Sequence, residues 1–128
     1  SERVVYCDGK ADRSTGKELQ VYGDANLLTL ALINLIRNAL QAVEGQEDGI
    51  VRVDTCAGAT GHLLIIITDN GPGIPPERLS AIFTPFFSTK SGGSGIGLPI
   101  SQRIMQLHGG QLSVSSIPNV RTEFRMEF

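Results

Sequence analysis

Residues 69–95 constrain the fold more than any other part of the chain. They are rich in glycine and proline and leave room for only one short helix, near Glu77 to Ile82. A stretch of this length without regular structure is uncommon in a compact domain unless it has a function, such as covering an active site. The whole chain is also rich in glycine, with 15 in 128 residues, about 12% against an average of roughly 7%. We therefore expect a lid at about residues 75–95.

Regular elements are expected on both sides of this lid. Asp24 is predicted to cap a helix of about five turns, and a second helix is predicted to end before Gly109 and Gly110. Apolar, β-branched runs predict the strands. The expected strands are Arg3–Cys7, Glu18–Tyr22, Ile50–Cys56, Leu63–Thr68, Gln111–Ser116 and Arg121–Phe128, and the expected helices are Asn26–Val43 and Gly97–Leu107. Because this order lacks regular βαβ alternation, the sequence predicts one α+β domain over residues 1–128, with helices on one face of a mixed sheet.

Composition and charge limit the possible functions. The net charge of −2 and pI of 5.6 provide no general attraction to nucleic acid or to an anionic membrane. No apolar run reaches the roughly 18 residues of a membrane span. Cys7 and Cys56 are interpreted as reduced thiols. We therefore expect a cytoplasmic domain, whose parent protein could still be anchored in a membrane.

The long helix carries a short polar patch near its C-terminal end. The patch consists of Asn34, Arg37, Asn38 and Gln41. At 100° per residue these side chains fall within an arc of roughly 100°, and the same face is apolar nearer the N-terminus. A solvated stripe is one explanation. Two asparagines four residues apart have mediocre helix propensity, and they also suit a site for a metal ion or a phosphate.

Glycine segments flank the predicted lid. The segment 69–74 follows an apolar strand and would make a turn, but a buried Asp69 carboxylate also suits a ligand donor such as an exocyclic amine. The segment 92–98 precedes a helix, where free N–H groups and the helix dipole favour an anion; a flexible linker is the alternative. Lys90 adds a cation that could reach the phosphates of an anionic ligand bound at this helix start. Three phenylalanines in the segment 83–87 would anchor the lid.

Taken in order, these segments resemble the ATP-binding catalytic domain of sensor histidine kinases, within the GHKL superfamily that includes gyrase, Hsp90 and MutL. The matching segments are Asn34–Ala39 (the N box), Asp69–Ile74 (the first glycine box), Phe83–Lys90 (the F box) and Gly93–Leu98 (the second glycine box), and His108-Gly109-Gly110 is also similar. The resemblance implies the Bergerat fold, a two-layer α/β sandwich that holds ATP between its helices and the lid.

The resemblance also implies roles for individual residues. Asp69 would accept a hydrogen bond from the adenine amino group, Gly73 would let the base approach, and Thr122 would reach the base through water. Asn38 would ligate Mg²⁺, and Asn34 and Lys90 would act with it on the phosphates as catalytic residues. Arg121 stands where the family usually has glycine, which makes the role of Thr122 less certain. The implied nucleotide-binding set is Asn34, Arg37, Asn38, Asp69, Gly71, Gly73, Ile74, Lys90, Gly93, Ser94, Gly95, Ile96, Gly97, Leu98 and Thr122.

The same resemblance separates kinase from ATPase. Related ATPases carry a glutamate where this chain has Asn34, and a carboxamide is not a useful general base. We therefore expect transfer of the γ-phosphoryl group of Mg-ATP to a histidine on a separate dimerisation hairpin, upstream of a response regulator in two-component signal transduction. Neither His62 nor His108 has the context of that acceptor, so the hairpin is expected before Ser1 and the domain is expected to be monomeric. The alternatives are an inert nucleotide-dependent interaction module and a GHKL ATPase.

Overall fold

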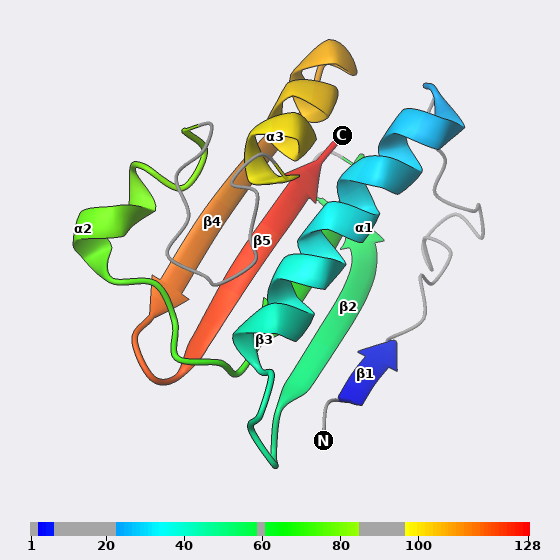
Figure 1. Cartoon of the computed structure of the whole chain (residues 1–128). Helices are drawn as coiled ribbons and strands as arrows, with labels where there is room; N and C mark the ends of the chain where they lie inside the picture. The colour runs from blue at the N-terminus through cyan, green and yellow to red at the C-terminus, as the bar shows by residue number, and fades with distance from the viewer. Residues whose placement is uncertain (1–2, 7–22, 59–60, 85–96) are drawn as a thin grey trace.

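The computed structural model describes residues 3–6, 23–58, 61–84 and 97–128, which form a five-stranded sheet with α1 and α3 side by side on one face (Figure 1). The strand order is β1-β2-β3-β5-β4. β1 runs parallel to β2, and all other neighbouring strands are antiparallel, so the sheet is mixed as expected. The strands are β1 (Arg3–Tyr6), β2 (Ile50–Ala57), β3 (Leu63–Asp69), β4 (Gln111–Ile117) and β5 (Arg121–Glu127), and the helices are α1 (Ala25–Ala42), α2 (Pro76–Leu79) and α3 (Gly97–Leu107).

Most of the predicted elements are confirmed. α3 has the predicted bounds, and α1 begins and ends one residue before the predicted helix. The helix predicted near Glu77 to Ile82 is α2, which is shorter and ends at Leu79. The strand predicted at Glu18–Tyr22 and the lid beyond Thr84 lie outside the described residues. No helix in the described part of the chain is long and apolar enough to span a membrane.

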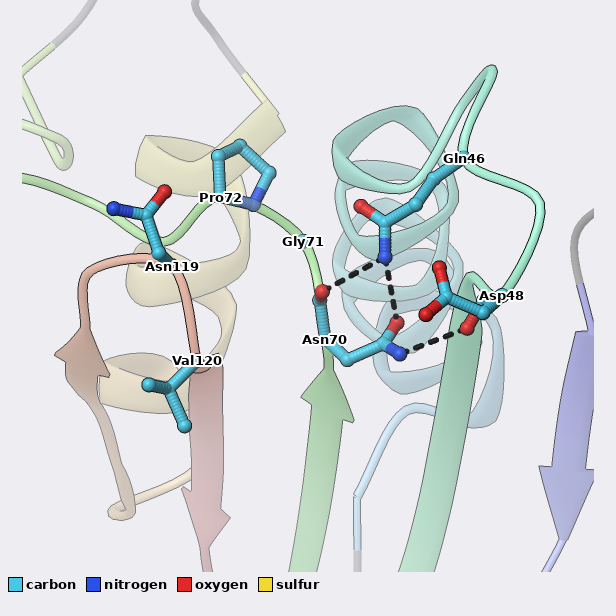
Figure 2. A pocket seen from close by; sticks show the side chains of 7 residues that line it. All are labelled: Gln46, Asp48, Asn70, Gly71, Pro72, Asn119 and Val120. Carbon is cyan, nitrogen blue, oxygen red and sulfur yellow. Dashed lines mark hydrogen bonds between the residues drawn. The ribbon is translucent and has the colours of Figure 1, made fainter.

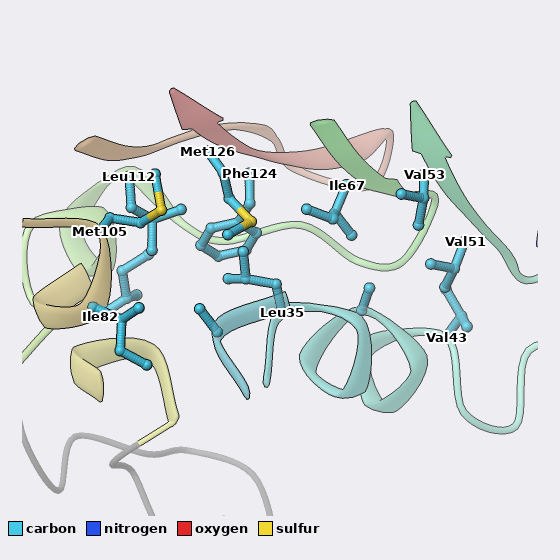
Figure 3. Packing of buried hydrophobic residues seen from close by; sticks show 13 residues of the cluster. Leu35, Val43, Val51, Val53, Ile67, Ile82, Met105, Leu112, Phe124 and Met126 are labelled. Carbon is cyan, nitrogen blue, oxygen red and sulfur yellow. The ribbon is translucent and has the colours of Figure 1, made fainter. Parts of the chain in front are cut away.

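The hydrophobic core lies between the sheet and the two long helices (Figure 3). Along β5 the buried residues alternate with more exposed ones, which places Phe124 and Met126 on the face that the helices cover. Leu35 of α1 and Met105 of α3 pack on this face. Each side chain of this size contributes about 1.5–3 kcal/mol when it is fully buried. The core therefore fixes both helices against the middle of the sheet.

The opposite face of the sheet carries two ion pairs. Arg52 pairs with Asp54 along β2, and Arg125 pairs with Glu123 along β5, each at 2.9 Å. The hydrogen bond to Glu123, followed by the charge of that carboxylate, raises the pKa of the Arg125 guanidinium. Both arginine side chains are exposed, so we expect each pair to add little to stability.

Polar contacts hold α1 and α3 together as an antiparallel pair. The backbone N–H of Asp24, the N-cap of α1, donates to His108 Nε2 at 3.0 Å. His108 Nδ1 lies 2.8 Å from the carbonyl oxygen of Ile104, so Nδ1 carries the proton and Nε2 is the acceptor. Further along the pair, Ser101 Oγ donates to the carbonyl of Ala31 at 3.1 Å. The imidazole thus links the start of α1 to the end of α3 through hydrogen bonds.

We expect His108→Ala to lower the free energy of unfolding by about 1 kcal/mol or more, because Asp24 loses the acceptor for its N–H group. Chemical denaturation measures the change. Gln106→Ala, at an exposed position of α3, is the matched control and should stay within about 0.5 kcal/mol of the parent. Equal unfolding midpoints for the His108 variant and the parent would contradict the role given to the imidazole.

Candidate functional site

A buried carboxylate stands at the end of β3. Asp69 is 2% exposed, and its Oδ1 accepts a hydrogen bond from the Gly71 N–H at 2.9 Å. In the sheet register Asp69 lies opposite Val51 of β2 and Thr122 of β5. Directly opposed residues point to the same face of a sheet, so the carboxylate and the Thr122 hydroxyl lie side by side under the helices. A buried carboxylate is costly without donors, which makes this corner the leading candidate for ligand binding.

The segment that follows β3 is packed too closely for side chains at two positions. A Cβ on Gly71 would lie 2.8 Å from the carbonyl oxygen of Ala42, at the end of α1. Gly73 has φ of 78°, and its Cβ would lie 2.9 Å from both the carbonyl oxygen of Ile117 and the Cα of Pro118. The fold itself therefore needs glycine at both positions, in addition to the approach of a base that the family resemblance implies at Gly73.

Asn70 fixes the other side of this segment. Its Oδ1 accepts from the Ile50 N–H at 2.7 Å, and its Nδ2 donates to the carbonyl of Asp48 at 2.8 Å. Gln46 Nε2 donates to the backbone carbonyl of Asn70 at 3.0 Å. The sequence pattern marks Asn70 only as part of an Asn-Gly turn after a strand, and its links to Gln46, Asp48 and Ile50 depend on the fold. These bonds hold the loop between α1 and β2 against the end of β3.

The polar patch of α1 connects this corner with the start of α3. Asn34 Nδ2 donates to the carbonyl of Gly97, the first residue of α3, at 3.3 Å. Residues four apart share a helix face, so half-buried Asn38 lies between Asn34 and Ala42, which contacts Gly71. The face thus runs from the second glycine segment to the first. Arg37 is exposed.

Some predicted site residues are therefore brought together, and others fall outside the described structure. Asn34 and Asn38 lie on the C-terminal half of α1, with Gly97 against Asn34 and with Gly71, which donates to Asp69, against Ala42. Thr122 lies beside Asp69, Gly73 and Ile74 lie against the end of β4, and half-buried Leu98 packs against the core. The residues outside the described part are Lys90, Gly93, Ser94, Gly95 and Ile96, and their roles stay predictions.

The described part of the lid is anchored on the core. The Phe83 ring packs edge-on against Phe124, with ring centroids 6.5 Å apart. Ile82, beside it, is buried. The predicted aromatic anchor is thus confirmed for Phe83, whereas Phe86 and Phe87 lie outside the described residues. Phe83 therefore attaches the described part of the lid to Phe124 of β5.

An open groove of about 430 Å³ lies next to the site (Figure 2). It separates the loop between α1 and β2 from the turn between β4 and β5, and its lining residues are Gln46, Asp48, Asn70, Gly71, Pro72, Asn119 and Val120. Asn34, Asn38, Asp69 and Thr122 do not line it. The groove and the buried carboxylate are therefore distinct features that meet at Gly71.

The family model for histidine kinase-, DNA gyrase B- and HSP90-like ATPases matches residues 23–128. The chain belongs to this family. Its relatives include the sensor histidine kinase ZraS of Salmonella typhimurium, 42% identical over 98 residues that cover 77% of this chain and 21% of ZraS. The sensory histidine kinase/phosphatase NtrB of Vibrio alginolyticus is 38% identical over 131 residues, covering 95% of this chain and 37% of NtrB.

Solved structures agree with the sequence relatives. The catalytic domain of the histidine kinase ThkA superimposes with a TM-score of 0.76 at 29% identity, covering 98% of this chain and 78% of that one. Full-length ShkA in complex with AMPPNP gives a TM-score of 0.80 at 25% identity and covers 98% of this chain and 25% of that one. The chain is thus a catalytic ATPase domain of the sensor histidine kinase type, and it spans well under half of the two sequence relatives.

Gly73→Ala should destabilise the fold even without a ligand, because the added Cβ meets the backbone of Ile117 and Pro118. Gly45→Ala is the matched control: Gly45 has φ of 79° but nothing within 4 Å of its Cβ. Both variants carry the strain of a positive φ, about 1–2 kcal/mol. Thermal and urea unfolding should show the larger loss for Gly73→Ala, and equal losses would mean that the predicted overlap has no effect.

Proposed function

We propose that this domain binds Mg-ATP along the half-buried face of α1 that carries Asn34 and Asn38, and transfers its γ-phosphoryl group to a histidine on a separate dimerisation hairpin. The observation that carries the proposal is the alignment of Asn34, Asn38 and Ala42 on one helix face, from Gly97 to the corner of Asp69. In the proposed site, the base binds at the Asp69 end of this face and the phosphates bind at the Gly97 end. Two-component signalling, with a response regulator downstream, is the pathway that the sensor histidine kinase relatives suggest.

The base end of the proposed site is Asp69. An ionised carboxylate only accepts hydrogen bonds, so it pairs with the exocyclic amino group of adenine and not with the 6-oxo group of guanine or hypoxanthine. Thr122 lies beside the carboxylate and supplies a hydroxyl that can donate or accept. Gly71 keeps a side chain away from the carboxylate, because a Cβ there would lie 2.9 Å from Asp69 Oδ1. The chemistry of this end therefore favours adenine.

The phosphate end of the proposed site is the start of α3, where the helix dipole and free N–H groups attract anions. Asn34 contacts this end, and we assign Lys90, Gly93, Ser94, Gly95 and Ile96 to the phosphates as well. Asn38 offers a neutral carboxamide oxygen, which suits a hard cation, and phosphates and water would complete the six ligands of Mg²⁺. The ion would neutralise charge on the phosphates. Arg37 is the exposed cation on the same helix.

Asn34 favours transfer to an acceptor over hydrolysis. Its carboxamide cannot take a proton from water near neutral pH, and its Nδ2 already donates to Gly97. Phosphoryl transfer needs mainly positioning and charge neutralisation, which this set of residues supplies. Phosphate release by the domain alone should therefore be slow, and adding an acceptor hairpin should give ADP and a phosphorylated histidine, not free phosphate. Rapid hydrolysis without any acceptor would favour the ATPase alternative.

Calorimetric titration with ADP and AMPPNP, with and without Mg²⁺, tests the proposal. We expect saturable binding that Mg²⁺ strengthens in the parent. Asn38→Ala should lose the Mg²⁺-dependent part of the affinity, whereas Asn26→Ala, at an exposed position of α1, should keep it. Absence of nucleotide binding by the parent, or unchanged Mg²⁺ dependence in the Asn38 variant, would contradict the site.

Asp69→Asn should remove the preference for adenine while the fold is retained. The amide oxygen can still accept from the Gly71 N–H, but the NH₂ group is a donor facing the amino group of the base. Loss of one hydrogen bond to a charged group, about 1.5–3 kcal/mol, corresponds to roughly 10- to 150-fold weaker ADP binding. Asp48→Asn, in the neighbouring groove, is the control. An ADP affinity that falls only in the Asp48 variant would move the site to the groove.

A further inference from the structure

Ser116 of β4 joins three segments across β5 from the buried carboxylate. Its Oγ accepts a hydrogen bond from the Ile74 N–H at 2.8 Å and lies 3.0 Å from Thr122 Oγ1. It also donates to the carbonyl of Arg121 at 3.1 Å. One hydroxyl thus connects the first glycine segment, the start of β5 and the end of β4. The family resemblance attaches no role to this residue.

The sheet register places Ser116 in line with the proposed site. Ser116 lies opposite Thr122, and Thr122 lies opposite Asp69, so the three side chains form a row on the covered face. Ser116 is separated from Asp69 by the width of β5. It therefore contacts the neighbours of the carboxylate without lying next to the carboxylate itself. Any influence on a ligand at Asp69 would act through Thr122 and Ile74.

The single hydroxyl proton of Ser116 affects how Thr122 can form hydrogen bonds. Ser116 has one hydroxyl proton and two acceptors within reach, the Arg121 carbonyl and Thr122 Oγ1. When the proton goes to Arg121, Thr122 donates to Ser116 and presents only lone pairs to its other side. When it goes to Thr122, the Thr122 proton is available to a ligand. The direction in which the Ser116 hydroxyl points therefore decides whether Thr122 offers a ligand a proton or only lone pairs.

Ser116 also sets the position of the glycine segment. The bond to Ile74 N–H adds to the close contact of Gly73 with Ile117 and Pro118. Asn119 N–H donates to the carbonyl of Pro72 at 2.7 Å on the other side of the same turn. The segment 72–74 is therefore attached to the β4–β5 hairpin at successive residues. Of these contacts, the bond from Ile74 to the Ser116 hydroxyl is the one that involves a neighbour of Thr122.

We propose that Ser116 is a positioning residue for the base end of the nucleotide site, acting through the Thr122 hydroxyl and the Ile74 backbone. The inference rests on the proposed nucleotide binding at Asp69. Removing the hydroxyl leaves the Ile74 N–H without its acceptor and frees Thr122 to rotate. The discrimination between a 6-amino and a 6-oxo purine should then fall, because the groups beside Asp69 are no longer held.

The test compares ADP with inosine diphosphate, which differs in carrying a 6-oxo group. Binding constants for both are measured on the parent, Ser116→Ala, Ser116→Thr and Ser115→Ala. The control Ser115 is exposed on the same strand and points to the opposite face. The ratio of the two binding constants is the readout, since partial unfolding lowers the active fraction without changing that ratio.

We expect Ser116→Ala to reduce the preference for ADP by about 3- to 10-fold, the effect of one ordinary hydrogen bond. Ser116→Thr, which keeps the hydroxyl, and Ser115→Ala should retain the parent ratio. An unchanged ratio in Ser116→Ala, with ADP still preferred by the parent, would overturn the role of Ser116 and leave nucleotide binding intact. A parent that binds neither nucleotide would overturn the proposed function, and this inference with it.

Amide exchange supplies a measurement that needs no ligand. In the nucleotide-free chain, Ser116→Ala should speed exchange of the Ile74 amide proton relative to the parent, while Ser115→Ala should not. Equal Ile74 exchange in the parent and Ser116→Ala would show that the serine does not hold the segment, and would overturn the proposal even for a variant that binds ADP poorly.

Discussion

A carboxylate buried at the end of a strand has to be surrounded by donors, and the segment after β3 is built around that requirement. Asp69 receives the Gly71 N–H, and Gly71 can come close enough only because it has no side chain to meet the end of α1. The chain then turns through Gly73 against the β4–β5 hairpin. Asn70 ties the same turn to the start of β2. Asn70, Gly71 and Gly73, together with the carboxylate itself, thus connect the end of β3 to α1, β2 and the β4–β5 hairpin.

The helices carry the other half of the proposed site, and polar contacts as well as the core connect them. His108, Ser101 and Asn34 each bond across the α1–α3 pair. Since α1 presents Asn34 and Asn38 and α3 begins at Gly97, the spacing of the pair sets the distance between the carboxamides and the helix N-terminus. A contact remote from the nucleotide, such as His108 with Asp24, therefore belongs to the framework of the site.

The sequence predicted features whose signals are local. The cap at Asp24, the bounds of α3 and the turn-forming glycines each follow from residues within a few positions of one another. The adjacency of Asp69 and Thr122 depends instead on strand order, which the sequence pattern left open. Ser116 was missed for the same reason: a serine in a strand has no signal until its cross-strand neighbours are known. The order of the family motifs compensated for this at Asp69 and Thr122.

A crystal structure of the chain with AMPPNP and Mg²⁺ tests the central claim most directly. We expect the adenine amino group within about 2.7–3.2 Å of the Asp69 carboxylate. We also expect the phosphates along α1 towards the start of α3, with Asn38 facing the metal ion. A nucleotide bound instead in the open groove beside Asp48 and Asn119, with Asp69 still buried and away from the base, would contradict that claim.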